Sequence, residues 1–368
     1  MNATVIQLPA AAAIDASDKF LEELSDIYLW DLPSDVPRGV RNGWCNLGSA
    51  KNIRLSETPI EPWAQGLLSL IQEQYPTGED DFAIEYTNMR FRGHRDSTVG
   101  GNLLAMRRQT MAVPRLDELL LPAWWVPLLM QKSLLKEGGL IVMAAALGCG
   151  KSTTIASLIR TRLEAYGGHA RTVEDPCELP LDGFWGDGVC VQCPVDPKVE
   201  PKIGWSTALR KMLRAYPAST EGGQILFIGE IRGSDVAAEA VRAAVNGQLV
   251  ITTIHASSVV TAIKRLVAFA AEDMGHEVAR DMVSSALRLV FTQNLRRNPN
   301  PSATGWQRRI IEGSVLASGG DGHPVGVNIR EGKFNMLNQS FDRLKKLMTT
   351  MKPADTPVEE LLRESAKA

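Results

Sequence analysis

The sequence predicts an α/β protein of two domains, in which a small α+β domain precedes a larger domain built on a parallel sheet. The main observation is that short apolar segments alternate with amphipathic segments across residues 136–350, a pattern typical of parallel strands joined by crossover helices. Residues 19–122 differ, since one amphipathic segment is followed there by two segments of strand character. The length of 368 residues also favours about two domains.

Segments without a core of their own are expected at both ends of the chain and between the domains. Residues 1–18 are Ala-rich and lack a periodic apolar face, which predicts a mobile tail. The smaller domain then covers 19–122, a linker 123–135 and the larger domain 136–350. Residues 351–368 predict a C-terminal tail with a loose surface helix.

The smaller domain contains one predicted helix and a predicted strand pair. Residues 63–71 place Trp and Leu side chains at helical spacing, and the Pro-Thr-Gly of 76–78 ends that pattern. Residues 82–86 and 89–92 then predict two paired strands.

In the larger domain the predicted strands and helices alternate from residue 140 to residue 254, and one further strand and helix follow toward the C-terminus. They are strand 140–145, helix 151–166, strand 224–228, helix 237–246, strand 249–254, strand 309–312 and helix 341–348. Residues 179–204, rich in Pro, Gly and Asp, and residues 216–223 predict loop insertions.

The composition argues against a dedicated nucleic-acid binder and against a membrane-spanning protein. Lys+Arg number 40 against 42 Asp+Glu, so we expect no direct nucleic-acid contact. The longest apolar stretches, such as 139–146 and 249–254, are far shorter than the roughly 20 residues of a spanning helix. The N-terminus lacks the basic region of a signal peptide, which predicts a cytoplasmic protein.

Five cysteines are too few and too scattered for a disulfide framework. Cys190 and Cys193 have the spacing of half a zinc site, but only Cys177 lies nearby as a third ligand. Tetrahedral zinc requires about four ligands, so a metal at these cysteines is the less favoured of two open interpretations.

A glycine-rich turn between strand 140–145 and helix 151–166 predicts a phosphate site. Backbone N–H groups of such a turn and of the following helix can surround a phosphate, a lysine adds positive charge, and a serine hydroxyl can bind Mg²⁺. The predicted ATP-binding residues are Gly148, Cys149, Gly150, Lys151, Ser152 and Thr153, with Ser152 also a Mg²⁺ ligand.

One residue departs from the G-x-x-x-x-G-K-[ST] pattern, because Ala145 stands at the position of its first glycine. If the turn needs a positive φ there, alanine carries a conformational cost and nucleotide affinity falls.

Two carboxylate positions follow predicted strands of the same domain. Glu230 comes just after strand 224–228, where P-loop enzymes place the acid that holds Mg²⁺ or polarises water. Residues 174–178 contain Glu174 and two further carboxylates, which could gather Mg²⁺ and activate water or could form only a polar turn.

Taken in order, these motifs resemble the secretion superfamily ATPases of type II and type IV secretion and type IV pili, most of all the PilT- and DotB-like branch. The resemblance covers about residues 82–348. It rests on Met89–Arg92, Met106–Arg108, the glycine-rich turn, the "Asp box" Val173–Pro176, Ala208–Arg214, the Walker B run Ile228–Arg232 and the "His box" Asn246–Ala256.

The resemblance implies a PAS-like N-terminal domain and a RecA-like P-loop motor domain, assembled as a homo-hexamer with ATP and Mg²⁺ between the domains. By the same resemblance, Glu174 and Glu230 share the magnesium and general-base roles, in an order that the sequence leaves open, and His255 senses the γ-phosphate or couples it to domain motion. The candidate charge-stabilising arginines are Arg92, Arg107, Arg108, Arg210, Arg214 and Arg232.

The predicted function is a hexameric ATPase that powers a type IV pilus or a type IV secretion or conjugation machine. Its implied partner is an inner-membrane platform protein, with peripheral membrane association through that partner. The alternative is a nucleotide-binding structural subunit with weak or no hydrolysis, which Ala145 favours.

Overall fold

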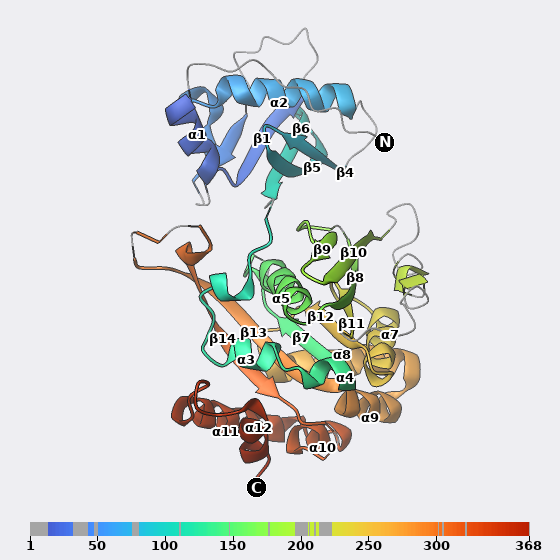
Figure 1. The fold of residues 1–368 in the computed structure, drawn as a ribbon. Coiled ribbons are helices and arrows are strands. Elements are labelled where there is room, and N and C mark those ends of the chain that lie inside the picture. Colours follow the sequence, from blue (N-terminus) through green and yellow to red (C-terminus); the bar gives the residue numbers. More distant parts are fainter. Residues whose placement is uncertain are drawn as a thin grey trace. The chain divides into compact units, whose positions relative to one another are not determined.

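The chain forms two compact units, residues 1–111 and 112–368 (Figure 1). The computed structural model describes residues 14–31, 43–47, 51–75, 81–109, 112–146, 148–175, 177–195, 205, 207–209, 211–212, 223–300, 302–303, 305–320 and 322–367. The boundary lies before the expected one at residue 122. The expected tail extended to residue 18, but its residues from 14 onward already belong to a helix, and the earlier ones lie outside the described residues.

The first unit is an antiparallel sheet with the strand order β3-β2-β1-β6-β5-β4. Its elements are α1 (Ile14–Glu23), β1 (Asp26–Asp31), β2 (Trp44–Asn46), β3 (Ile53–Arg54), η1 (Leu55–Glu57), α2 (Glu61–Gln74), β4 (Asp81–Tyr86), β5 (Met89–Thr98) and β6 (Gly101–Gln109). The helix over 63–71 and the paired strands predicted at 82–92 are therefore confirmed.

The core of the first unit lies between α2 and the sheet (Figure 1). Ala64, Leu67 and Ile71 recur at helical spacing and are buried with the inward residues of the strands, which is why this amphipathic segment is a helix. The tight turn between β4 and β5 consists of Thr87 and Asn88, both with positive φ, as two-residue hairpin turns require.

The second unit is an eight-stranded sheet with the order β14-β13-β7-β12-β11-β8-β10-β9. The six strands from β13 to β10 run parallel, and β14 and β9 pair antiparallel at the two edges. The strands are β7 (Gly139–Ala144), β8 (Gly168–Glu174), β9 (Gly183–Trp185), β10 (Gly188–Pro194), β11 (Gln224–Ile228), β12 (Leu249–Ile254), β13 (Leu287–Arg297) and β14 (Arg309–Ala317).

Helices cover both faces of this sheet. They are η2 (Leu116–Glu118), α3 (Trp125–Leu129), α4 (Ser133–Glu137), α5 (Lys151–Tyr166), α7 (Ser234–Val245), α8 (Val259–Met274), α9 (His276–Ala286), η3 (Gly305–Arg308), α10 (Pro324–Arg330), η4 (Phe334–Met336), α11 (Leu337–Thr350) and α12 (Val358–Ala366). Along β7, Leu140 and Val142 pack with α7, α8 and α9, whereas Ile141 and Met143 pack with α3 and α5. This confirms the parallel α/β architecture predicted from the alternation of apolar segments.

Three segments differ from the sequence-based expectations. Residues 123–135, expected as a linker, form α3 and the start of α4, and Trp125 is buried against Phe291 at 4.8 Å between ring centroids. Part of the expected loop insertion at 179–204 forms β9 and β10, because β10, which contains Val189 and Val191, pairs with β8, and β9 pairs with β10. The helix expected in the C-terminal tail is present as α12, but it is not loose on the surface, because its Leu361 is fully buried.

Among the described residues, no helix is both long and apolar enough to cross a membrane.

Candidate active site

The glycine-rich turn joins the end of β7 to the first residue of α5. Gly148 and Gly150 have φ of 76° and 78°, in the left-handed region that side chains with a Cβ rarely adopt. A Cβ on Gly150 would also lie 3.2 Å from Nε2 of Gln293. Both glycines are therefore required by the backbone, and α5 begins directly after them with Lys151.

The conformational cost anticipated for Ala145 is absent. Among the described residues, only Thr87 and Asn88 combine a side chain with a positive φ, and Ala145 is simply buried. The departure at Ala145 thus leaves the backbone of the turn unstrained at that position.

Lys151 lies across the turn that precedes it. Its Nζ donates to the carbonyl oxygens of Ala145 and Ala146, at 2.8 Å and 3.1 Å. Burial lowers the pKa of Lys151, and the negative charge of Glu230 opposes this shift. The end of the Lys151 side chain is therefore held at the carbonyl groups of the turn itself.

A buried glutamine supports the turn from the neighbouring strand β13. Gln293 is 1% exposed, and its Nε2 donates to the carbonyl oxygen of Cys149 at 2.7 Å. No sequence motif pointed to Gln293, because its role arises only from the pairing of β13 with β7.

Glu174 and Glu230 follow from neighbouring parallel strands. Glu174 is the last residue of β8, and Glu230 follows β11, whose Ile228 is paired with Val173. The N–H of Gly229 donates to the carbonyl of Val173 at 2.8 Å, which keeps the two strand ends together. Parallel strands end at one edge of the sheet, so the two carboxylates predicted from separate motifs share that edge.

The two carboxylates have different surroundings. Glu174 is 7% exposed, and burial raises its pKa, an effect opposed by a hydrogen bond from Nε2 of Gln192 at 2.9 Å. Glu230 uses both oxygens: Oε1 lies 3.1 Å from Nε2 of His255, and Oε2 accepts from Nε of Arg232 at 2.5 Å. Three predicted site residues, Glu230, His255 and Arg232, are thus in direct contact.

The order of the strands explains this cluster. β12 lies beside β11, so His255, which follows β12, reaches Glu230 from the adjacent strand end. The hydroxyl of Thr253 donates to the carbonyl of Gly229 at 2.6 Å, and NH1 of Arg265 donates to the carbonyl of His255 at 2.8 Å. Both contacts restrict the loops that carry the cluster.

Ser152 and Thr153 occupy the first turn of α5 and are half-buried.

Within the described ranges, no group of three His, Cys, Asp or Glu side chains is arranged to hold a metal ion. Cys190 and Cys193 both lie on β10, and burial raises the pKa of each thiol.

The candidate arginines of the first unit have distinct surroundings. Arg92 and Arg107 are directly paired across β5 and β6 and are both exposed. Arg107 also contacts Asp26, with Nε to Oδ1 at 2.9 Å. Arg108 is half-buried, and its NH1 donates to the carbonyls of Leu21 and Glu22 at the end of α1. Arg210 and Arg214 lie outside the described residues.

A sequence profile for the family described as type II/IV secretion system protein matches residues 81–335. The chain belongs to this family. The matched range runs from β4 into η4 and contains the glycine-rich turn, both carboxylates and His255.

Named relatives agree with the PilT- and DotB-like branch expected from the motifs. The type IV pilus ATPase PilU of Pseudomonas aeruginosa is 29% identical over 269 residues, which cover 70% of this chain and 64% of PilU. The solved structure of the pilus retraction motor PilT with bound ADP has a TM-score of 0.67 at 24% identity, covering 95% of this chain and 96% of PilT. The ATPase DotB of Legionella pneumophila has a TM-score of 0.60 at 19% identity, covering 95% of each chain. The fold is therefore that of a RecA-like motor domain preceded by a smaller N-terminal domain.

Proposed function

We propose that this chain hydrolyses MgATP as a homo-hexamer and powers a type IV pilus or a type IV secretion or conjugation machine. The proposal depends on one arrangement: Lys151 begins α5 directly after the glycine-rich turn, and Glu174 and Glu230 stand at the ends of the neighbouring parallel strands β8 and β11. Membership in the type II/IV secretion family supports the same reading.

The residues of the turn fit a nucleotide and magnesium. The positive φ of Gly148 and Gly150 allows a tight turn whose N–H groups can bind phosphate oxygens, beside the positive end of α5. Ser152 and a carboxylate would hold Mg²⁺, which is usually bound by one or two carboxylates together with substrate phosphates. Magnesium, when bound, supplies electrostatic stabilisation of the phosphates.

The two carboxylates are suited to different roles. Both oxygens of Glu230 are engaged, by His255 and Arg232, which suits a fixed group that orients Mg²⁺. Glu174 is buried and its raised pKa makes it the better proton acceptor near neutral pH. We therefore assign the general base to Glu174 and the magnesium role to Glu230, with His255 coupling Glu230 to the end of β12.

Charge on the transferred phosphoryl group would be stabilised by arginines, including ones from a neighbouring subunit. Arg92 and Arg107 suit this role better than Arg108, because they are exposed side by side while Arg108 binds carbonyls of α1. Arg232 is exposed at the site itself, and Arg210 and Arg214 complete the candidates. The further elements of the proposal are a PAS-like first unit, a cytoplasmic location, an inner-membrane platform protein as partner and no direct nucleic-acid contact.

The second candidate is a nucleotide-binding structural subunit with weak hydrolysis. It depended on a strained Ala145, and the unstrained backbone at that residue makes it the weaker reading.

Purified protein should hydrolyse ATP only with Mg²⁺, and the specific rate should rise with protein concentration as hexamers form. Lys151→Ala should abolish turnover, because the turn loses its cation, whereas Glu230→Gln should still bind nucleotide but not hydrolyse it. Lys136→Ala, at an exposed lysine of α4, is the matched control. Turnover in Lys151→Ala equal to that of the control would refute the assigned nucleotide site. If the wild-type protein binds ATP but does not hydrolyse it, the structural-subunit function is favoured instead.

A further inference from the structure

The side-chain amide of Gln192, on β10, is held in one orientation by its hydrogen bonds. Its Oε1 accepts from the backbone N–H groups of Leu181 and Asp182, at 2.8 Å and 3.0 Å. An amide oxygen that already faces two donors cannot exchange places with its nitrogen without losing both bonds. The nitrogen therefore faces the other way, and Nε2 donates to Oε1 of Glu174 at 2.9 Å.

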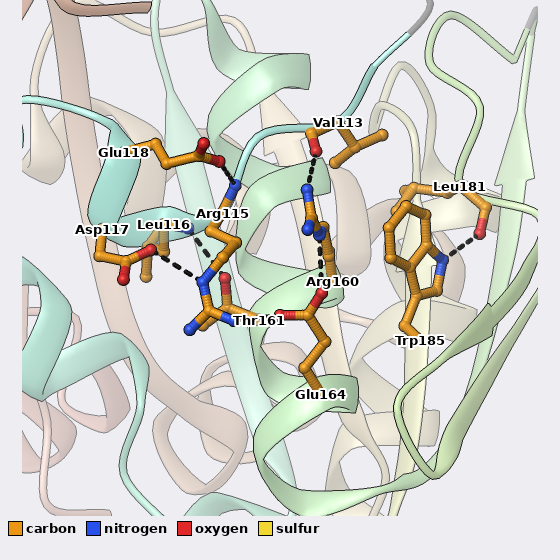
Figure 2. Close-up of polar contacts among 10 residues, drawn as sticks. All are labelled: Val113, Arg115, Leu116, Asp117, Glu118, Arg160, Thr161, Glu164, Leu181 and Trp185. Atoms are coloured by element: carbon orange, nitrogen blue, oxygen red, sulfur yellow. Dashed lines mark hydrogen bonds and ion pairs between the residues drawn. The ribbon is translucent and has the colours of Figure 1, made fainter.

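The backbone around this amide is restrained as well. The N–H of Gln192 donates to Oδ1 of Asp182 at 2.8 Å, so the two residues bind each other in both directions. Trp185 donates from Nε1 to the carbonyl of Leu181 at 2.8 Å (Figure 2). Hydrogen bonds to both the N–H and the carbonyl group of Leu181 therefore restrain the segment that orients Gln192.

This restrained segment also contacts the helix that begins with the phosphate turn. The guanidinium of Arg160, on α5, lies 4.9 Å from the ring centroid of Trp185. Figure 2 shows Arg160 on α5, hydrogen-bonded to Glu164 and to the carbonyl of Val113. A continuous series of contacts thus runs from α5 through Trp185, Leu181 and Gln192 to Glu174.

Glu174 needs such support, because little water can reach it. At 7% exposure, its carboxylate cannot rely on solvent to choose its rotamer or to satisfy its oxygens. A base that takes a proton from an attacking water must lie within hydrogen-bonding reach of that water, so its orientation decides the rate.

We propose that Gln192 is a positioning residue that holds the Glu174 carboxylate toward the attacking water. This inference rests on the proposed ATPase function. In this role Gln192 acts through its hydrogen bond to Glu174. The competing explanation is that Gln192 only fastens the loop before β9, in which case the bonds to Leu181 and Asp182 matter and the bond to Glu174 does not.

Two variants of Gln192 separate these explanations. Gln192→Met has a similar size and removes every hydrogen bond of the amide. Gln192→Glu keeps an acceptor for Leu181 and Asp182 but removes the donor to Glu174. Gln224→Met, at a half-buried glutamine in the first position of β11 and so at the opposite edge of the sheet, is the matched control.

The experiment measures kcat and KM for MgATP, the Kd of a fluorescent ATP analogue and the thermal midpoint of each variant. Loss of a partner that orients a metal ligand typically lowers activity about 10–100-fold, and we expect a loss of the same size for a residue that orients a general base. Both Gln192 variants should show this loss in kcat, with KM and Kd within about threefold of wild type. In a Glu174→Gln background, Gln192→Met should add less than about a threefold further loss, because the group it positions is already gone.

Wild-type kcat in Gln192→Glu would overturn the positioning role, since that variant retains the loop contacts. Independent, multiplicative losses in the double variant would overturn it too. If Gln192→Met fails to fold, wild-type kcat in Gln192→Glu still overturns the positioning role, and Gln192→Glu in the Glu174→Gln background, where no second carboxylate faces position 192, separates charge repulsion from positioning. Failure of the wild-type protein to hydrolyse MgATP would instead refute the proposed function together with this inference, and the two failures are therefore distinguishable.

Discussion

Replacing Gly150 by alanine should destabilise the second unit and weaken nucleotide binding. Gly150 has φ of 78° and ψ of 19°, a left-handed conformation that costs a residue with a Cβ about 1–2 kcal/mol. The new Cβ would lie 3.2 Å from Nε2 of Gln293 and 3.2 Å from Cδ1 of Leu295. Gln293 would have to move, which weakens its bond to Cys149 and adds about 1 kcal/mol.

Gly148 provides the matched control for this substitution. Its φ of 76° imposes a similar backbone cost of about 1–2 kcal/mol on alanine, but a Cβ there meets nothing within 4 Å. The total is therefore about 2–3 kcal/mol for Gly150→Ala and about 1 kcal/mol less for Gly148→Ala.

Thermal unfolding without nucleotide measures the difference. A unit of this size loses roughly 2–4 °C per kcal/mol, so Gly150→Ala should lower the midpoint by about 4–12 °C. Gly148→Ala should lower it by a smaller amount, and KM for ATP should rise more in Gly150→Ala. Equal midpoints for the two variants would refute the role assigned to the Gln293 contact, and a wild-type midpoint in both would refute the backbone strain.

Three further outcomes follow from other contacts. Burial lowers the pKa of His323, so the unfolded chain takes up a proton at a higher pH than the folded chain does. The free energy of unfolding should therefore fall as the pH drops below about 6.5. Urea titrations should show a smaller fall for His323→Gln than for the wild-type protein. Arg108→Ala should destabilise the first unit by about 1–3 kcal/mol, because two carbonyls of α1 lose a charged donor. Arg107→Ala should cost at most about 1 kcal/mol, because that side chain is 72% exposed, but it should lower kcat. Calorimetry with a turnover assay checks both arginines, and equal destabilisation by the two would contradict the distinction.

Local patterns in the sequence were sufficient for the central elements of the larger domain. The apolar run 249–254 is buried on both faces as β12, and the amphipathic run 151–166 is α5 to the residue. Elements of a sheet that is buried between two layers of helices need such apolar patterns, so the sequence of each segment is enough to predict the element. The glycine-rich turn could likewise be predicted from the sequence, because its positive φ angles require glycine.

Other segments differ from their sequence-based predictions because their structure depends on the strands and side chains that they pack against. Residues 188–194 contain the glycine and proline typical of loops, yet they form β10 because β8 offers an unpaired edge. Residues 123–135 have the composition of a linker, but they are packed into the domain because Trp125 contacts Phe291. The composition of a segment does not identify its partner, whether that partner is 20 residues away, as Gly168 is from Gly188, or more than a hundred, as Phe291 is from Trp125.

The sequence by itself determined that a strand, a glycine-rich turn and a helix follow one another, and that carboxylates stand after two other strands. Only the tertiary structure decided that Glu174 and Glu230 share an edge, that Gln192 faces the first and His255 the second. The reason is that the residues of a strand do not specify which strands lie on either side of it. The positions of β8, β11 and β12 in the sheet come from packing over the whole unit, and a glutamine acquires its role only from the neighbour that this order supplies.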